Sequence, residues 1–271
     1  MAGHMADALD LNADAGESFG PWTLGRDAEL FALVSSVNLA CGFHAGDPLT
    51  IRRAVTLAKA HNVSVGAHPG YPDRVGFGRR SLAARPEEVF ADVLYQLGAL
   101  EGFLRLEGLP LHHVKPHGAL YLDMARDAGT ARAVAAAVAA FDPALPLVVL
   151  AGPGGETMRR AAEDAGLRAV AEAFPDRAYL PDGRLAGRAV PNAVLHDPNR
   201  IAERAVAMAQ GEAFAALGGG AVRVQAETLC LHGDHPGALE NARAVRAALE
   251  RAGIAVRSFG ASATLRPERS P

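Results

Sequence analysis

Leu9-Asp10-Leu11-Asn12-Ala13-Asp14 alternates apolar and polar side chains from end to end. Because successive side chains of a β-strand point to opposite faces, the leucines lie on one face and the aspartates and the asparagine on the other. We expect the leucine face to pack against helices. A polar second face is poorly tolerated in an open parallel sheet, which is buried on both sides. The segment therefore favours a closed (β/α) barrel with a polar interior over a doubly wound sheet.

Two further segments show the same split. In His113-Val114-Lys115-Pro116-His117 the histidines and the lysine share a face, and in Leu229-Cys230-Leu231-His232 the cysteine and the histidine do. His44 and His68 each end another strand-like segment. Functional groups of (β/α) barrels gather where strands end and loops begin, so these side chains predict a site at that rim.

Strand-like and helix-like segments alternate along the chain, which predicts parallel βαβ units. Strands are expected at 8–13, 36–41, 63–67, 112–117, 147–151, 167–173, 228–232 and 254–258. Helices are expected at 48–61, 86–107 and 236–252, with an alanine-rich helix over 131–141. The buried stripes predicted for the first three are Ile51, Ala54, Val55 and Ala58, then Phe90, Val93, Leu94, Leu97 and Leu104, then Ala238, Ala242, Val245 and Leu249.

The composition excludes several classes of function. Hydrophobic residues make up 49% of the 271 residues and charged residues 21%. The formal net charge of -3 does not indicate the basic surface that binds nucleic acid. The sequence contains no run of about 18 apolar residues, so it predicts no membrane-spanning helix. Two cysteines indicate a reducing compartment, so we expect a cytoplasmic protein. We interpret residues 1–5 as a cloning remnant, 6–262 as a single barrel domain and 263–271 as a disordered tail.

Several polar residues have a structural interpretation that competes with a functional one. Asp47 and Asp234 each precede a predicted helix and could serve as N-caps. Asp10 could be a buried hydrogen-bonding residue at the barrel floor. Cys41 and Cys230 are expected to be small buried residues and not nucleophiles.

Lys115 is the strongest single candidate for a functional residue. The chain has two lysines, Lys59 and Lys115, and all the other residues in its combined count of lysine and arginine are arginines. A lysine on a barrel-facing strand supplies a compact ammonium group that a planar guanidinium does not replace. Lys59 lies on a predicted helix and is expected to be solvated. Gly152-Pro153-Gly154-Gly155 opens a helix and could meet a phosphate, although the chain contains no P-loop sequence.

Six segments follow one another between Leu9 and Phe259. They are Asp10-Leu11-Asn12-Ala13-Asp14-Ala15-Gly16-Glu17, Asn38-Leu39-Ala40-Cys41-Gly42-Phe43-His44-Ala45-Gly46-Asp47-Pro48, Gly66-Ala67-His68-Pro69-Gly70-Tyr71-Pro72-Asp73, Lys115-Pro116-His117-Gly118-Ala119-Leu120-Tyr121, Glu172-Ala173-Phe174-Pro175-Asp176-Arg177-Ala178-Tyr179 and Cys230-Leu231-His232-Gly233-Asp234. Together they resemble the LamB/YcsF family. Leu122 stands where that family usually has Asn, and Pro175 where it usually has Ala; neither change removes a titratable group.

The resemblance implies a single distorted (β/α) barrel similar to the glycoside hydrolase and deacetylase type. It also implies a hydrolase acting on a cyclic amide, as the A subunit of an ATP-dependent 5-oxoprolinase. Such an enzyme opens the lactam of 5-oxo-L-proline to L-glutamate with ATP hydrolysis, together with partner subunits B and C. ATP is then a co-substrate. Zinc or manganese is a further expected cofactor, because imidazole and carboxylate groups suit these ions.

The lactam chemistry assigns roles to the rim residues. We expect the catalytic groups to be Asp14, Glu17, His44, His68, Lys115 and His117. Asp14, with Glu17 nearby and positioned by Asn12, would act as base or proton shuttle. Lys115 and Arg177 would balance phosphate or oxyanion charge. The expected substrate-binding residues are Asn12, Glu172, Arg177, His232 and Asp234. The expected metal ligands are Asp14, His44 and His68. The sequence leaves open whether His44, His68 and His117 act as acid/base groups or, with Asp14, as ligands of the metal.

Two other functions are compatible with the same residues. The first is a metal-dependent deacetylase or amidase that acts alone and needs no ATP. The second is a non-catalytic subunit that binds the lactam and delivers it to a partner. Activity that requires both ATP and partner subunits would separate the 5-oxoprolinase function from both.

Overall fold

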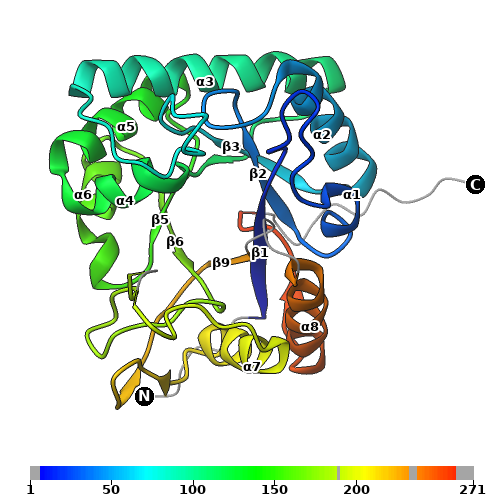
Figure 1. Ribbon diagram of the computed structural model, residues 1–271, viewed down its shortest axis with the longest axis vertical. Coiled ribbons are helices and arrows are strands. Elements are labelled where there is room, and N and C mark those ends of the chain that lie inside the picture. The colour runs from blue at the N-terminus through cyan, green and yellow to red at the C-terminus, as the bar shows by residue number, and fades with distance from the viewer. Residues whose placement is uncertain (1–6, 188–189, 232–236, 261–271) are drawn as a thin grey trace, which may run out of the picture.

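The polar strand at the start of the chain closes a ring of parallel strands (Figure 1). It is β1 (Ala8–Ala15), which pairs with β2 (Ser36–Ala40) on one edge and with β9 (Thr228–Leu231) on the other. The ring continues from β2 through β3 (Ser64–His68), β4 (His113–Val114), β5 (Leu147–Leu150) and β6 (Ala169–Ala173), and β6 pairs with β9. The computed structural model therefore has a closed parallel barrel, as the sequence predicts, and not a doubly wound sheet; seven of the eight predicted strands form the ring.

The structure describes residues 7–187, 190–231 and 237–260. The predicted cloning remnant at 1–5 and the predicted tail at 263–271 lie outside these residues. His232 and Asp234, two expected substrate-binding residues, also lie outside them.

Helices surround the barrel in the order of the strands (Figure 1). They are α1 (Asp27–Leu30), α2 (Pro48–His61), α3 (Pro86–Glu107), α4 (Gly118–Arg126), α5 (Ala128–Phe141), α6 (Glu156–Asp164), α7 (Pro198–Ala209) and α8 (Ala238–Arg251), with a 3-10 turn, η1 (Pro153–Gly155), before α6. The expected helices 48–61 and 86–107 have these bounds. Among the described residues, no helix has both the length and the apolar character needed to cross a membrane.

The last predicted strand lies outside the ring. Residues 254–258 contribute only β10 (Ala255–Val256), which pairs with the first two residues of β1. No place in the ring is left for it, because β9 pairs with both β6 and β1. A small antiparallel hairpin, β7 (Phe214–Ala215) and β8 (Ala221–Val222), precedes β9. The expected strand 112–117 is shortened to two residues, and Pro116 has no N–H to continue the ladder.

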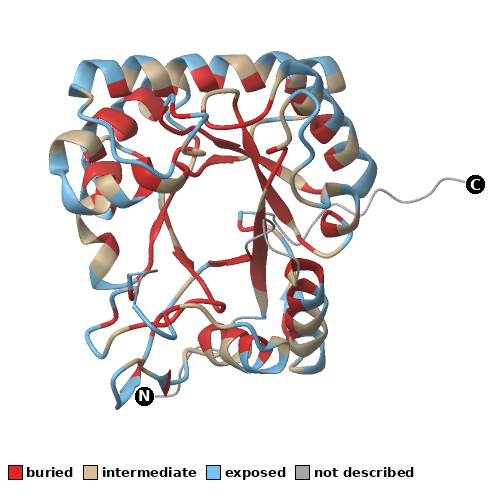
Figure 2. Ribbon diagram, in the orientation of Figure 1, coloured by how far each residue is buried: buried red, intermediate tan, exposed pale blue. Residues whose placement is uncertain are grey.

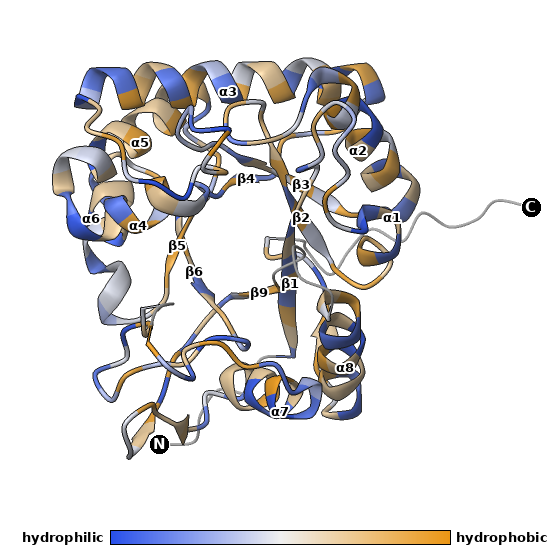
Figure 3. Ribbon diagram, in the orientation of Figure 1, coloured by the Kyte–Doolittle hydropathy of each residue, from blue (hydrophilic) through white to orange (hydrophobic). Residues whose placement is uncertain are grey.

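The apolar core fills the layer between strands and helices. Leu9 and Leu11 of β1 are buried in this core, as expected. Figure 2 shows that the barrel strands are largely buried, whereas exposed residues gather on the helices and loops. The predicted stripes of α2 and α8 are buried completely. The stripe predicted for α3 is wrong at Phe90 and Leu94, which are half-buried, because the buried line of this helix runs through Val89 and its neighbours one turn apart. Figure 3 shows hydrophobic and hydrophilic residues alternating along these outer helices.

Candidate active site

The barrel floor is built around the buried carboxyl group of Asp10 on β1. The hydroxyl groups of Ser35 and Ser36 donate to it at 2.7 and 2.9 Å, and Thr228 donates a third hydrogen bond. Burial raises the pKa of Asp10 to about 6, against the opposite effect of these hydrogen bonds. These contacts agree with the structural interpretation of Asp10 as a buried, hydrogen-bonded residue.

Two asparagines form the next layer of the barrel interior. Asn38 Nδ2 donates to Asn12 Oδ1 at 2.8 Å and to Asp14 Oδ1 at 2.9 Å. Asn38 Oδ1 lies 2.7 Å from Nε2 of His113. On its other side, Asn12 Nδ2 donates to Glu172 Oε1 at 3.0 Å. Asn12 and Asp14 are therefore linked through Asn38, which is fully buried on β2.

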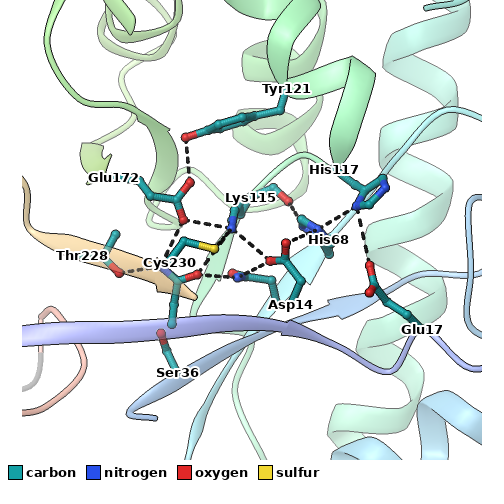
Figure 4. A network of polar contacts seen from close by, with 12 residues as sticks. Asp14, Glu17, Ser36, His68, Lys115, His117, Tyr121, Glu172, Thr228 and Cys230 are labelled. Carbon is teal, nitrogen blue, oxygen red and sulfur yellow. Dashed lines mark hydrogen bonds and ion pairs between the residues drawn. The ribbon is translucent and has the colours of Figure 1, made fainter. Parts of the chain in front are cut away.

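Lys115 lies above this layer between two carboxylates (Figure 4). Its Nζ is 2.9 Å from Asp14 Oδ1 and 2.9 Å from Glu172 Oε1, and its side chain is 3% exposed. Burial lowers the pKa of Lys115, but the charges of Asp14 and Glu172 outweigh it, so the pKa lies well above its usual value. Lys115 faces the barrel interior, as predicted, and it is a buried cation and not a base at neutral pH.

Two further groups complete this network (Figure 4). The hydroxyl of Tyr121, on α4, donates to Glu172 Oε2 at 2.9 Å. Burial and the adjacent Glu172 raise the pKa of Tyr121 well above its usual value, so the phenol remains a donor. Lys115 Nζ donates to Cys230 Sγ at 3.0 Å, and burial raises the pKa of this thiol. Cys41 and Cys230 are both buried, as expected.

A second cluster joins the ends of four neighbouring strands. Glu17 follows β1, His44 lies in the loop after β2, His68 ends β3 and His117 follows β4. One potential ligand atom of each lies within 4.8 Å of the others, and all four side chains are buried. These four residues, here called the His–Glu cluster, could hold a metal ion.

The members of the cluster are in close contact with one another. The rings of His44 and His117 stack with centroids 3.7 Å apart. Glu17 Oε1 lies 3.6 Å from His44 Nε2 and 3.7 Å from His117 Nδ1. His68 Nε2 lies 3.0 Å from His117 Nδ1 and 3.4 Å from Asp14 Oδ2. Asp14 is thus shared, because one of its oxygens faces the lysine and the other faces His68.

Burial keeps two of these imidazoles neutral. Desolvation, and next the neighbouring His68, lower the pKa of His117 to about 3. Desolvation, and next His117, lower the pKa of His44 well below its usual value. Near pH 7 each ring therefore offers a lone pair on one nitrogen.

Two glycines in the loop after β3 let the backbone approach the stacked histidines. A Cβ on Gly70 would lie 2.8 Å from His44 Nδ1. A Cβ on Gly78 would lie 2.7 Å from His44 Cβ and 2.8 Å from His117 Cδ2. Gly78 also has a φ of 62°, in the region that residues with a Cβ rarely adopt. Glycine at these positions therefore allows the close packing of the two rings.

A cavity of about 190 Å³ opens beside the lysine and the cluster. Its lining includes the polar residues Asp14, His68, Lys115 and His117, the arginines Arg79 and Arg177, and the apolar residues Leu122, Leu150, Phe174 and Leu185. A small ligand in it would meet an ammonium, a carboxylate and two guanidinium groups.

Most of the predicted site residues meet around this cavity. Four of the predicted catalytic residues line it, and the other two, Glu17 and His44, lie in the adjoining His–Glu cluster. Of the predicted substrate-binding residues, Arg177 lines the cavity, whereas Asn12 and Glu172 lie in the network around the lysine and are at most 1% exposed. Two of the three predicted metal ligands belong to the His–Glu cluster, and the third, Asp14, contacts its edge.

Asn38, Tyr121 and Arg79 contribute to the site without being among its predicted residues. Strand alternation could have found Asn38, because it lies two residues from Ser36 on the same interior face of β2. No comparable periodicity marks Tyr121 and Arg79, which reach the site from a helix and a loop. Asp47 caps α2 by accepting from the N–H groups of residues 49 and 50, as expected.

The sequence and the fold are similar to those of known proteins. A sequence model of the LamB/YcsF family matches residues 9–264. A Thermus thermophilus protein named as the A subunit of 5-oxoprolinase is 62% identical over 93% of this chain and 99% of its own length. The crystal structure of a lactam utilization protein, also from Thermus thermophilus, aligns with a TM-score of 0.89 and 62% identity, covering 93% of this chain and 100% of that one. A family 4 carbohydrate esterase from Streptomyces lividans aligns with a TM-score of 0.46 and 13% identity over 93% of each chain.

Proposed function

Because the chain belongs to the LamB/YcsF family, we propose that it is the A subunit of an ATP-dependent 5-oxoprolinase. It would open the lactam of 5-oxo-L-proline to L-glutamate, coupled to ATP hydrolysis and together with subunits B and C in the cytoplasm. The observation that carries this proposal is the 62% identity, over almost the full length, to a protein named as the A subunit of 5-oxoprolinase. The cavity beside Lys115 supports it, because its size suits a small ring.

The charges around the cavity match those of the proposed substrate. 5-Oxo-L-proline carries a carboxylate, and Arg79 and Arg177 both line the cavity, so either guanidinium could bind this group. The apolar lining at Leu150 and Phe174 would contact the methylene groups of the ring. These contacts would hold the lactam carbonyl beside Lys115.

Lys115 would act electrostatically. A lactam is opened once its carbonyl oxygen has accepted the γ-phosphoryl group of ATP, with ADP leaving, because the carbon then becomes electrophilic. Negative charge comes to this oxygen with the transferred phosphoryl group, while the electron pair displaced when water adds to the carbon goes to the ring nitrogen. The buried ammonium of Lys115 is fixed between Asp14 and Glu172 before the reaction, so it stabilises that charge without reorganisation.

Asp14 would move the protons. Its side chain is 17% exposed, against 0% for Glu172, so it is the carboxylate of this pair that can reach a water molecule in the cavity. As a base, Asp14 would take a proton from the attacking water. The C–N bond then breaks, the ring nitrogen receives that proton, and a second water releases phosphate from the acyl group to leave glutamate. Glu17 lies in the adjoining His–Glu cluster and could pass protons to solvent.

The test is glutamate release from 5-oxo-L-proline by the purified chain, with and without ATP, and then with subunits B and C added. Turnover that requires ATP and both partners is the expected result. Asp14→Asn should abolish it, whereas the matched variant Asp47→Asn should not, because Asp47 caps a helix and asparagine is an equally good cap. Turnover without ATP would favour a stand-alone amidase. Unchanged turnover of complexes containing Lys115→Ala would favour a subunit that only binds the lactam.

A further inference from the structure

We propose that the His–Glu cluster, formed by Glu17, His44, His68 and His117, is the binding site of one divalent metal ion of the zinc class. The ligand set differs from the one that the sequence suggested, because Glu17 and His117 replace Asp14 in direct contact with the ion. The inference rests on the proposed function only for the role of the metal and not for its presence.

The hydrogen bonds of two histidines fix where their protons are. Carbonyl oxygens only accept hydrogen bonds. His68 Nδ1 lies 2.6 Å from the carbonyl oxygen of Lys115, and His117 Nε2 lies 2.8 Å from that of Phe77, so both nitrogens carry hydrogen. With hydrogen on those two nitrogens, the ring atoms that face each other are His68 Nε2 and His117 Nδ1, which lie 3.0 Å apart. Two facing lone pairs repel each other unless a cation lies between or beside them.

The spacing of the cluster suits a tetrahedral ion. Zinc binds imidazole nitrogen and carboxylate oxygen at about 2.0–2.2 Å, which places neighbouring ligand atoms about 3.3–3.6 Å apart at the tetrahedral angle. Glu17 Oε1 lies 3.6 Å from His44 Nε2 and 3.7 Å from His117 Nδ1. The contact between His68 and His117, at 3.0 Å, is the one that would have to widen.

The surroundings of the cluster are those of a metal site. Histidine ligands usually donate their second ring N–H to a carbonyl or carboxylate, as His68 and His117 do here. His44 is 1% exposed, and neither of its ring nitrogens has a hydrogen-bond partner among the described residues. A buried polar atom in this state is costly, and coordination of an ion by Nε2 would satisfy it.

The donor set also limits the identity of the ion. Three imidazoles and one carboxylate suit zinc, cobalt or manganese, whereas magnesium prefers an all-oxygen octahedral site. Because His68 and His117 line the cavity, the ion would lie next to the bound lactam. Asp14 Oδ2, 3.4 Å from His68 Nε2, would face it from the cavity side.

The experiment measures metal binding by the full chain, without ATP, partners or turnover. The chain is stripped with a chelator and titrated with Zn²⁺, Mn²⁺ and Mg²⁺ by calorimetry, and the metal content of untreated protein is measured by mass spectrometry. We expect one Zn²⁺ per chain, weaker Mn²⁺ binding and weaker still Mg²⁺ binding. Glu17→Gln and His44→Gln should each lower the Zn²⁺ affinity by at least about tenfold. The control His61→Gln, at an exposed residue that ends α2, should leave the affinity unchanged.

A second readout needs no variant. Co²⁺ added to the stripped chain should give the intense visible absorption of a tetrahedral site with nitrogen and oxygen ligands. Absence of stoichiometric Zn²⁺ binding would overturn the proposal and leave a proton shared by His68 and His117 as the occupant. Binding that both variants retain would overturn it as well, because the ion would then lie elsewhere. Failure of glutamate release with normal Zn²⁺ binding would count against the proposed function and not against the metal site.

Discussion

Replacing Asp10 with asparagine should remove the loss of stability that this residue causes as the pH rises. In the folded protein burial raises the pKa of Asp10 from the usual 3.8 to about 6. Between these values the unfolded chain loses the proton while the folded chain keeps it. Stability of the wild type is therefore lost as the pH rises from about 4 to about 6, and the loss persists above that range.

The size of the effect follows from the two pKa values. One pKa unit corresponds to about 1.4 kcal/mol, so a shift of about two units costs the wild type about 3 kcal/mol at pH 7 relative to pH 3.5. Asparagine does not titrate. Asp10→Asn also alters the hydrogen bonds with Ser35, Ser36 and Thr228, which changes stability by an amount that does not depend on pH. Beyond that constant, the free energy of unfolding of the variant minus that of the wild type should increase by about 3 kcal/mol from pH 3.5 to pH 7.

The assay is urea-induced unfolding of both proteins at pH 3.5, 5 and 7, at constant ionic strength. Asp47→Asn is a control of opposite sign. Hydrogen bonds, that of the Gly20 N–H first, lower the pKa of Asp47 to about 2, so this residue stabilises the fold above its unfolded pKa and the benefit is lost as the pH falls. Its variant should lose stability relative to the wild type by similar amounts at pH 7 and pH 5 and by somewhat less at pH 3.5, because the pKa of about 2 lies below this range. A difference between Asp10→Asn and wild type that is the same at all three pH values would refute the reasoning about Asp10.

Three further changes test the site. Asp14→Asn should abolish glutamate release. The melting temperature should change little, because Lys115 keeps its ion pair with Glu172. A large fall in melting temperature, measured by calorimetry, would mean that Asp14 is structural. Lys115→Met should lower the free energy of unfolding by about 3–5 kcal/mol at pH 7, because it leaves the buried Glu172 and the half-buried Asp14 without their cation; an unchanged urea midpoint would contradict this. Gly78→Ala should lower the melting temperature by more than Gly20→Ala. Both positions have a positive φ, but only a Cβ at residue 78 would meet histidine atoms. Equal falls in melting temperature would show that backbone strain alone matters.

Local patterns predicted much of the fold. The capping residue Asp47 and the 3.6-residue stripe set α2 to its observed bounds. Alternation of side chains placed Asp14 and Lys115 inside the barrel, because this direction depends only on the strand itself. The stripe of α3 was predicted less well, since a long helix with apolar residues on several sides can turn more than one face inward, and only its neighbours decide which.

The sequence by itself determined that a parallel barrel forms, that its interior is polar and that a lysine lies within it. Only the tertiary structure decided which polar groups touch. Strand register places Asp14 opposite Asn38 on β2. The ends of four strands and the loops that follow them bring Glu17, His44, His68 and His117 together from distant parts of the chain. Alternation and periodicity are set within one strand or helix, whereas these distances depend on how neighbouring strands are aligned, and that alignment is fixed by the packing of the whole barrel.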